Sequence, residues 1–129
     1  MIQIKAGIGL EPYKIEIKSA TGNILISDEP VESGGQDKGF SPKELLASAL
    51  AACTCATLRM YAGRKNWELG QVNVTIDLIA EEGKTTFNRK LELHGDLDED
   101  QTKRLVSVAN ACPVHKILSN SIEINTELR

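Results

Sequence analysis

The first forty residues carry a β-strand pattern of apolar and polar positions. Apolar side chains stand at every second position of residues 13–17, and a second apolar segment, 24–26, follows turn-forming residues 20–23. With residues 2–4, these segments predict an antiparallel meander of about three strands with one buried face. Residues 28–39 combine proline, a glycine pair and mixed charges, which predicts an exposed loop rather than a linker between domains.

A strong helix-start signal follows this loop. Ser41 suits the N-cap, Pro42 suits the first helical position, and Glu44 completes a capping box. Residues 45–58 contain no charged side chain, so the predicted helix is apolar on nearly all sides. A domain of this size cannot cover such a helix alone, and we therefore predict a homodimer that buries it.

Alternation returns after the helix. Residues 72–78 and 87–93 each place apolar side chains on one parity and flank a turn at 81–84, which predicts a long hairpin. Asp98 and Gln101 form a second capping box ahead of another amphipathic helix.

Pro113 divides the C-terminal helical segment. It biases Cys112 away from helical geometry, so one helix should end near Ala111 and a short one should begin at Pro113. Residues 122–128 alternate again and predict a final strand. The order βββαββααβ, with strands grouped so that they can pair as hairpins, predicts an α+β fold in which residues 1–129 form a single domain.

Composition excludes several classes of partner. The net charge is only −3 and charges of both signs are interspersed, so no basic face favours nucleic acid or anionic lipid. The N-terminus shows no basic segment followed by an apolar run, which predicts a cytoplasmic protein without a secretory signal. The apolar run at 45–58 is shorter than the roughly 20 residues that a membrane-spanning helix needs.

The three cysteines are the candidate chemical groups. Their odd number, in a compartment expected to be reducing, argues against a disulfide framework. Cys112 stands at a helix N-terminus, where free N–H groups lower the pKa of a thiol, and His115 lies about one turn further on. Burial of Cys112 for packing alone is the competing interpretation.

Cys53 and Cys55 are two apart on the predicted helix and point about 200° apart, so they cannot readily bond to each other. One should face a cleft and the other the core, or both are small residues of a close helix packing. With Cys112 and His115 they are four candidate zinc ligands, but the spacing lacks the paired pattern of zinc sites, and we expect no metal and no cofactor. His94 is expected to be a solvated surface residue.

Two motifs carry a family resemblance. Residues 34–53 (GGQDKGFSPKELLASALAAC) and residues 112–115 (CPVH) resemble the OsmC/Ohr family, named for osmotically induced protein C and the organic hydroperoxide resistance protein. This peroxiredoxin-like resemblance spans nearly the whole chain. It implies antiparallel sheets around a long central helix, and an intertwined homodimer with active sites at the subunit interface.

The resemblance also assigns roles. It implies that Cys53 is the peroxidatic cysteine and that Cys112 is the resolving cysteine, while Glu44 matches a glutamate that orients an arginine beside the reactive thiol. The family's arginine lies in the N-terminal half, but the first arginine of this sequence is Arg59. Lys38 is the substitute we consider, although an ammonium lacks the planar fork of a guanidinium.

The implied function is a thiol peroxidase of antioxidant defence, which reduces organic hydroperoxides and is restored by an external dithiol. A sulfenic acid on Cys53 would condense with Cys112, with Cys55 filling the core. Two alternatives stay open. The missing N-terminal arginine favours a thiol-disulfide oxidoreductase or redox sensor with little peroxidase activity, and the interface cavity could instead serve a non-enzymatic protein that binds a hydrophobic ligand.

Overall fold

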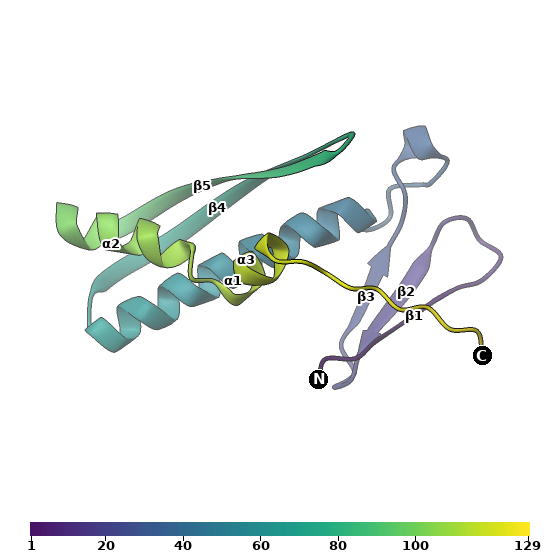
Figure 1. Ribbon diagram of the computed structural model, residues 1–129, viewed down its shortest axis with the longest axis horizontal. Coiled ribbons are helices and arrows are strands. Elements are labelled where there is room, and N and C mark those ends of the chain that lie inside the picture. The colour runs from purple at the N-terminus through teal and green to yellow at the C-terminus, as the bar shows by residue number, and fades with distance from the viewer. The chain divides into compact units, whose positions relative to one another are not determined.

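The computed structural model describes all residues, Met1–Arg129 (Figure 1). The elements in chain order are β1 (Ile4–Ile8), β2 (Ile15–Ser19), β3 (Ile24–Ser27), the 3-10 helix η1 (Val31–Ser33), α1 (Pro42–Lys65), β4 (Glu68–Glu81), β5 (Lys84–Asp96), α2 (Glu99–Ala109) and α3 (Pro113–Ser119). The chain forms two compact units, Met1–Leu46 and Ala47–Arg129. The expectation of a single domain stays a prediction.

The first unit contains the predicted meander. Strands β1, β2 and β3 pair antiparallel in sequence order, with Ile4 opposite Ser19 and Ile15 opposite Ser27. Side chains of β2 alternate between half-buried and exposed, as the alternation predicts, but those of β1 are exposed throughout. The sheet therefore keeps apolar surface that this chain does not cover.

Asp28 organises the loop that follows β3. Its side chain is 2% exposed, and its carboxylate accepts hydrogen bonds from the N–H groups of Glu29 at 2.8 Å and of Gln36 and Lys38 at 3.2 Å each. A fourth N–H, that of Tyr13, donates at 3.4 Å. The loop was predicted from its turn residues, but the buried carboxylate at its centre was not.

The predicted start of α1 is confirmed. The Ser41 N–H donates to the Glu44 carboxylate at 2.9 Å, and the Glu44 N–H donates to the Ser41 hydroxyl at 3.3 Å. The second capping box, between Asp98 and Gln101 at the start of α2, is also present. Both helices begin where side chains satisfy N–H groups that have no partner within the helix.

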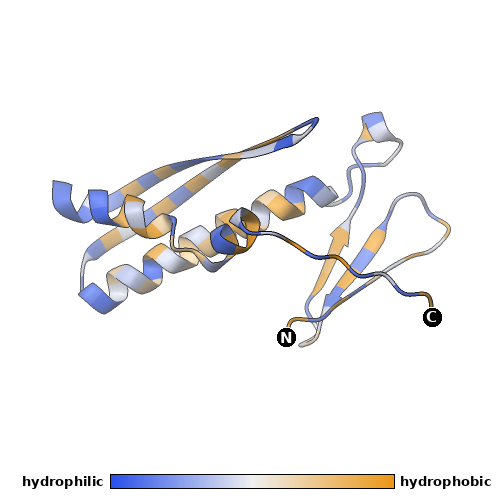
Figure 2. Ribbon diagram, viewed as in Figure 1, coloured by the Kyte–Doolittle hydropathy of each residue, from blue (hydrophilic) through white to orange (hydrophobic).

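The second unit is built on the hairpin β4–β5, which confirms the predicted pairing, with Ile76 opposite Arg89 and Leu78 opposite Phe87. In Figure 2, apolar and polar residues alternate along both strands. The core joins α1, β4 and α2 through six buried residues: Leu58, Ala62, Leu69, Leu105, Val108 and Ala109.

Only one face of α1 is covered within the chain. Its buried residues, Leu50, Thr54, Leu58 and Ala62, recur every four positions, while Met60 is 58% exposed. By length and composition α1 could also cross a membrane, a property that it shares with core helices of soluble proteins. The apolar surface of α1 therefore exceeds what its own chain buries.

The C-terminal segment departs from the prediction. Helices α2 and α3 end and begin close to the predicted residues, but no strand forms over 122–128. Ile122 is 60% exposed and Ile124 is 84% exposed. The predicted final strand is wrong for the single chain because a strand requires a neighbouring strand for its N–H and C=O groups, and the segment has none.

Replacing Asp28 with asparagine should destabilise the protein in a pH-dependent way. Burial alone would raise the pKa of this carboxyl, but hydrogen bonds from the N–H groups of Lys38, Glu29, Gln36 and Tyr13 lower it below 3.8. A carboxyl with a lowered pKa contributes stability above its unfolded pKa, and that contribution is lost as the pH falls through the folded pKa. The difference in Tm between wild type and Asp28→Asn should hold from pH 7 to about pH 4 and shrink below that. Equal Tm values at pH 7 in circular dichroism melts would contradict this.

Candidate active site

The structure brings two of the three cysteines together. Cys53 lies half-buried in the middle of α1, and Cys112 is fully buried as the N-cap residue of α3. Both are free thiols, and each influences the ionisation of the other. Cys55, two residues further along α1, is also free and half-buried.

The surroundings of Cys53 favour its thiolate. Burial raises the pKa of this thiol, but four groups together lower it below its usual value. In decreasing order of effect, these are the Cys112 thiol, the N–H of Val114, the hydroxyl of Thr57 and the charge of Arg89. The Thr57 hydroxyl lies 3.9 Å from the sulfur. Hydrogen bonds and a nearby cation stabilise the charged form more than burial destabilises it.

Cys112 has the opposite tendency. Burial raises the pKa of its thiol, and the hydrogen bond to Cys53 raises it further, while the N–H groups of His115 and Val114 lower it by less. The N–H groups at the start of α3 lower the pKa of Cys112, as its place at a helix N-terminus predicts, but burial and Cys53 outweigh them. The Cys112 sulfur is completely buried, and the helix N–H group of Val114 also serves Cys53.

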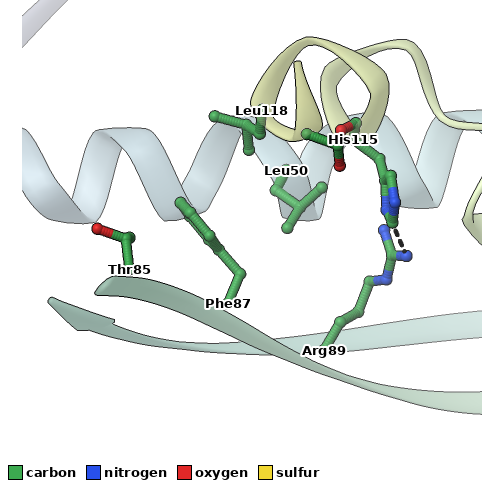
Figure 3. Close-up of a pocket in the computed structure, with 7 residues that line it drawn as sticks. Leu50, Thr85, Phe87, Arg89, His115 and Leu118 are labelled. Atoms are coloured by element: carbon green, nitrogen blue, oxygen red, sulfur yellow. Dashed lines mark hydrogen bonds between the residues drawn. The ribbon is translucent and has the colours of Figure 1, made fainter. Parts of the chain in front are cut away.

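Arg89 stands at the centre of the polar contacts. It projects from β5, and its Nη1 donates to the Thr54 hydroxyl at 3.1 Å. Its Nη2 lies 2.9 Å from the side-chain oxygen of Asn110 and 3.0 Å from Nδ1 of His115, the contact drawn in Figure 3. Because a guanidinium only donates hydrogen bonds, Nδ1 of His115 is the acceptor in this contact.

Arg89, Thr54 and Asn110 were not among the predicted site residues. The sequence nevertheless contained a signal, because Arg89 occupies the same strand parity as Phe87 and Leu91, which face the interior. A charged residue on an apolar parity is either paired or functional. Its position on the apolar parity identifies Arg89 as a candidate site residue, whereas no local sequence pattern identifies Thr54 or Asn110.

The two remaining predicted site residues belong to the first unit. The Glu44 carboxylate accepts from Ser41 in the capping box, and the Lys38 ammonium lies 3.5 Å from the Glu11 carboxylate. The cation beside Cys53 is thus an arginine from the second half of the chain. Lys38, the substitute considered from the sequence, pairs with Glu11, whereas the charge that acts on Cys53 is that of Arg89.

Two cavities share the walls formed by Phe87, Arg89 and His115. The first, of about 330 Å³, is shown in Figure 3 and is lined by Leu50, Thr85, Phe87, Arg89, His115, Leu118 and Ser119. The second, of about 440 Å³, is lined by Phe87, Arg89, Leu91, Val106, Ala109, Asn110 and His115. Apolar walls with a few convergent polar groups are typical of sites for small molecules.

Comparison with known proteins identifies the family. Residues 35–127 match the model of the OsmC-like protein family. The chain belongs to this family. The resemblance inferred from residues 34–53 and 112–115 is therefore confirmed.

Relatives of the OsmC-like chain support the fold. An uncharacterised protein of Acinetobacter baylyi is 28% identical over 104 residues, which is 77% of this chain and 73% of that protein. The crystal structure of an OsmC-like protein from Mycoplasma pneumoniae matches 92% of this chain and 87% of its own, with a TM-score of 0.79 at 23% identity. An organic hydroperoxide resistance protein OsmC from Legionella pneumophila matches 92% of this chain and 88% of its own, with a TM-score of 0.68 at 25% identity. The predicted α+β class, with antiparallel sheets and a long central helix, is confirmed.

Alkylation by iodoacetamide should distinguish the two thiols of the OsmC-like site. The rate follows the thiolate fraction, and each unit of pKa corresponds to about a tenfold change in that fraction below the pKa. Cys53, whose pKa is lowered, should react at lower pH than Cys112, whose pKa is raised. Mass spectrometry of peptides quenched between pH 5 and 9 measures both profiles. Modification of Cys112 before Cys53 in the folded protein would contradict the assignment.

Proposed function

We propose that this OsmC-like protein is a thiol peroxidase that reduces organic hydroperoxides through Cys53 and Cys112. The observation that carries the proposal is the pairing of a thiol with lowered pKa and a buried thiol with raised pKa, each of which influences the other. Such a pair separates the two roles, because one thiol ionises more readily than the other. Cys53 is then the nucleophile and Cys112 the resolving thiol.

The first step is an attack on the peroxide. The Cys53 thiolate attacks the terminal oxygen of the hydroperoxide, so that an S–O bond forms as the O–O bond breaks. The alkoxide takes a proton and leaves as an alcohol. Cys53 becomes a sulfenic acid and the hydroperoxide is reduced.

The second step closes a disulfide. The Cys112 sulfur attacks the sulfur of the Cys53 sulfenic acid, the S–S bond forms, and the hydroxyl leaves as water with the proton of the Cys112 thiol. Because Cys112 is near enough to affect the ionisation of Cys53, closure can precede further oxidation. An external dithiol then reduces the disulfide and restores both thiols.

Apolar walls beside Arg89 and His115 support an organic substrate. Leu50, Phe87 and Leu118 line the cavity that also contains Arg89 and His115 (Figure 3). Burying an alkyl chain there would favour an organic hydroperoxide over hydrogen peroxide, by roughly 0.8 kcal/mol for each buried CH₂ group. The Legionella pneumophila relative is likewise described as an organic hydroperoxide resistance protein.

Turnover of cumene hydroperoxide with dithiothreitol tests the proposal. Cys53→Ser should lower turnover by at least about a hundredfold because the nucleophile is lost. Cys112→Ser should react once and then accumulate overoxidised Cys53, because no resolving thiol remains. Cys55→Ser is the matched control and should keep wild-type turnover. Equal turnover in wild type, Cys53→Ser and Cys112→Ser would reject the peroxidase. A disulfide that cycles without peroxide turnover would instead favour the oxidoreductase.

A homodimer in the cytoplasm is the second part of the proposal. The buried residues of α1 lie on one face, Met60 on this helix is exposed, and the apolar C-terminal segment with Ile122 and Ile124 is exposed. A second copy would supply cover for both, since soluble chains rarely expose large apolar surfaces. A site that works through free thiols also requires a reducing compartment.

Sedimentation velocity measures the oligomeric state directly. At micromolar concentration the protein should sediment with twice the mass of the 14.1 kDa chain. A charged substitution on the exposed face of α1, Met60→Glu, should shift the species toward monomer. A wild-type monomer at that concentration would reject the dimer.

A further inference from the structure

Arg89 connects the two halves of the thiol site through neutral acceptors. Its three hydrogen bonds end on a hydroxyl, an amide oxygen and an imidazole nitrogen, belonging to Thr54, Asn110 and His115. None of the five ion pairs of the chain includes this arginine. A guanidinium always keeps its charge, and neutral acceptors hold it in place without neutralising it.

The three acceptors flank both cysteines along the chain. Thr54 follows Cys53 directly on α1, and its hydroxyl in turn donates to the Leu50 carbonyl at 2.7 Å, which fixes its orientation. The other two acceptors, Asn110 and His115, lie on either side of Cys112 in the chain. Asn110 is the C-cap residue of α2, and His115 lies within α3. One planar group therefore joins the strand β5, the helix that carries Cys53 and the connection that carries Cys112.

We propose that Arg89 is the positioning residue of the thiol pair, with two separable effects. Its charge offsets the negative charge of the Cys53 sulfur, and its three-point contact holds the Cys112 connection within reach of Cys53. This inference rests on the proposed redox function of the same pair. Arg89 on β5 would act beside the reactive thiol in place of the arginine that the family resemblance puts in the N-terminal half. This chain has no arginine before Arg59.

The two effects predict different behaviour for two substitutions. Lysine at this position keeps the charge but loses the planar fork that reaches three acceptors at once. Glutamine loses the charge as well. Arg89→Gln should therefore weaken both the thiolate and disulfide closure, whereas Arg89→Lys should weaken chiefly closure.

Two measurements on the full-length protein separate these effects without using a peroxide. The first is the pH profile of Cys53 alkylation, in which Arg89→Gln should reduce the rate at pH 6 by about tenfold for each unit of pKa gained. Arg89→Lys should change it by less. The second is the rate at which diamide closes the Cys53–Cys112 disulfide at a pH where Cys53 is fully ionised, which both variants should reduce.

Arg59 offers a matched control. It is also an arginine that ties α1 to the hairpin, since its guanidinium donates to the carbonyls of Leu69 and Gly70 in β4. Arg59→Gln removes a comparable tie without touching the thiols. It should leave the alkylation profile and the diamide rate at wild-type values.

Asn110→Ala keeps the inference testable if Arg89→Gln fails to fold, as judged by circular dichroism. It removes one acceptor while the charge stays, so it should slow closure and leave the alkylation profile unchanged. Wild-type values of both measurements in a folded Arg89→Gln, or in Arg89→Lys and Asn110→Ala together, would overturn the inference. So would equal losses in Arg59→Gln. If the wild-type protein does not turn over peroxide while the Arg89 variants show the expected changes, the peroxidase is rejected and the role of Arg89 is kept.

Discussion

The mutual influence of the Cys53 and Cys112 thiols is the interaction on which the site depends. Against the effect of burial, the Cys112 thiol helps to lower the pKa of Cys53, whereas burial and Cys53 together raise the pKa of Cys112, so the two pKa values move in opposite directions. The pair can keep this difference only if both sulfurs stay where they are. The surrounding structure supplies that constraint through α1, the start of α3 and the guanidinium of Arg89.

The way in which these elements meet explains the architecture of the second unit. Helix α1 carries Cys53, and the hairpin β4–β5 supplies Arg89, while the break between α2 and α3 supplies Cys112. The break follows from Pro113, which cannot continue a helix begun before it. A buried core shared by α1, β4 and α2 holds these pieces together. The chemistry of the pair is thus a product of packing between segments far apart in sequence.

Local patterns predicted most of the fold because they act locally. The capping boxes at Ser41 and Asp98, the break at Pro113 and the alternation in β4 and β5 each depend on a few neighbouring residues. The strand expected over 122–128 failed for the opposite reason, since a strand exists only beside a partner. Apolar and polar residues do alternate over 122–128, but no strand of the chain pairs with this segment. Helix α1 likewise keeps apolar surface that its own chain does not cover.

Site prediction succeeded where a residue carries its own signature and failed where the environment decides. Cys53, Cys112 and His115 lie in the same part of the second unit, but the ranking of the two thiols depended on burial and on the effect of each sulfur on the other. Neither is visible in sequence.

The most direct measurement is disulfide mapping after treatment of the reduced protein with less than one equivalent of an organic hydroperoxide. Our account predicts one product, a disulfide that links the peptides of Cys53 and Cys112, with Cys55 left as a free thiol. A protein that instead accumulates oxidised Cys112, or a bridge that involves Cys55, would contradict it.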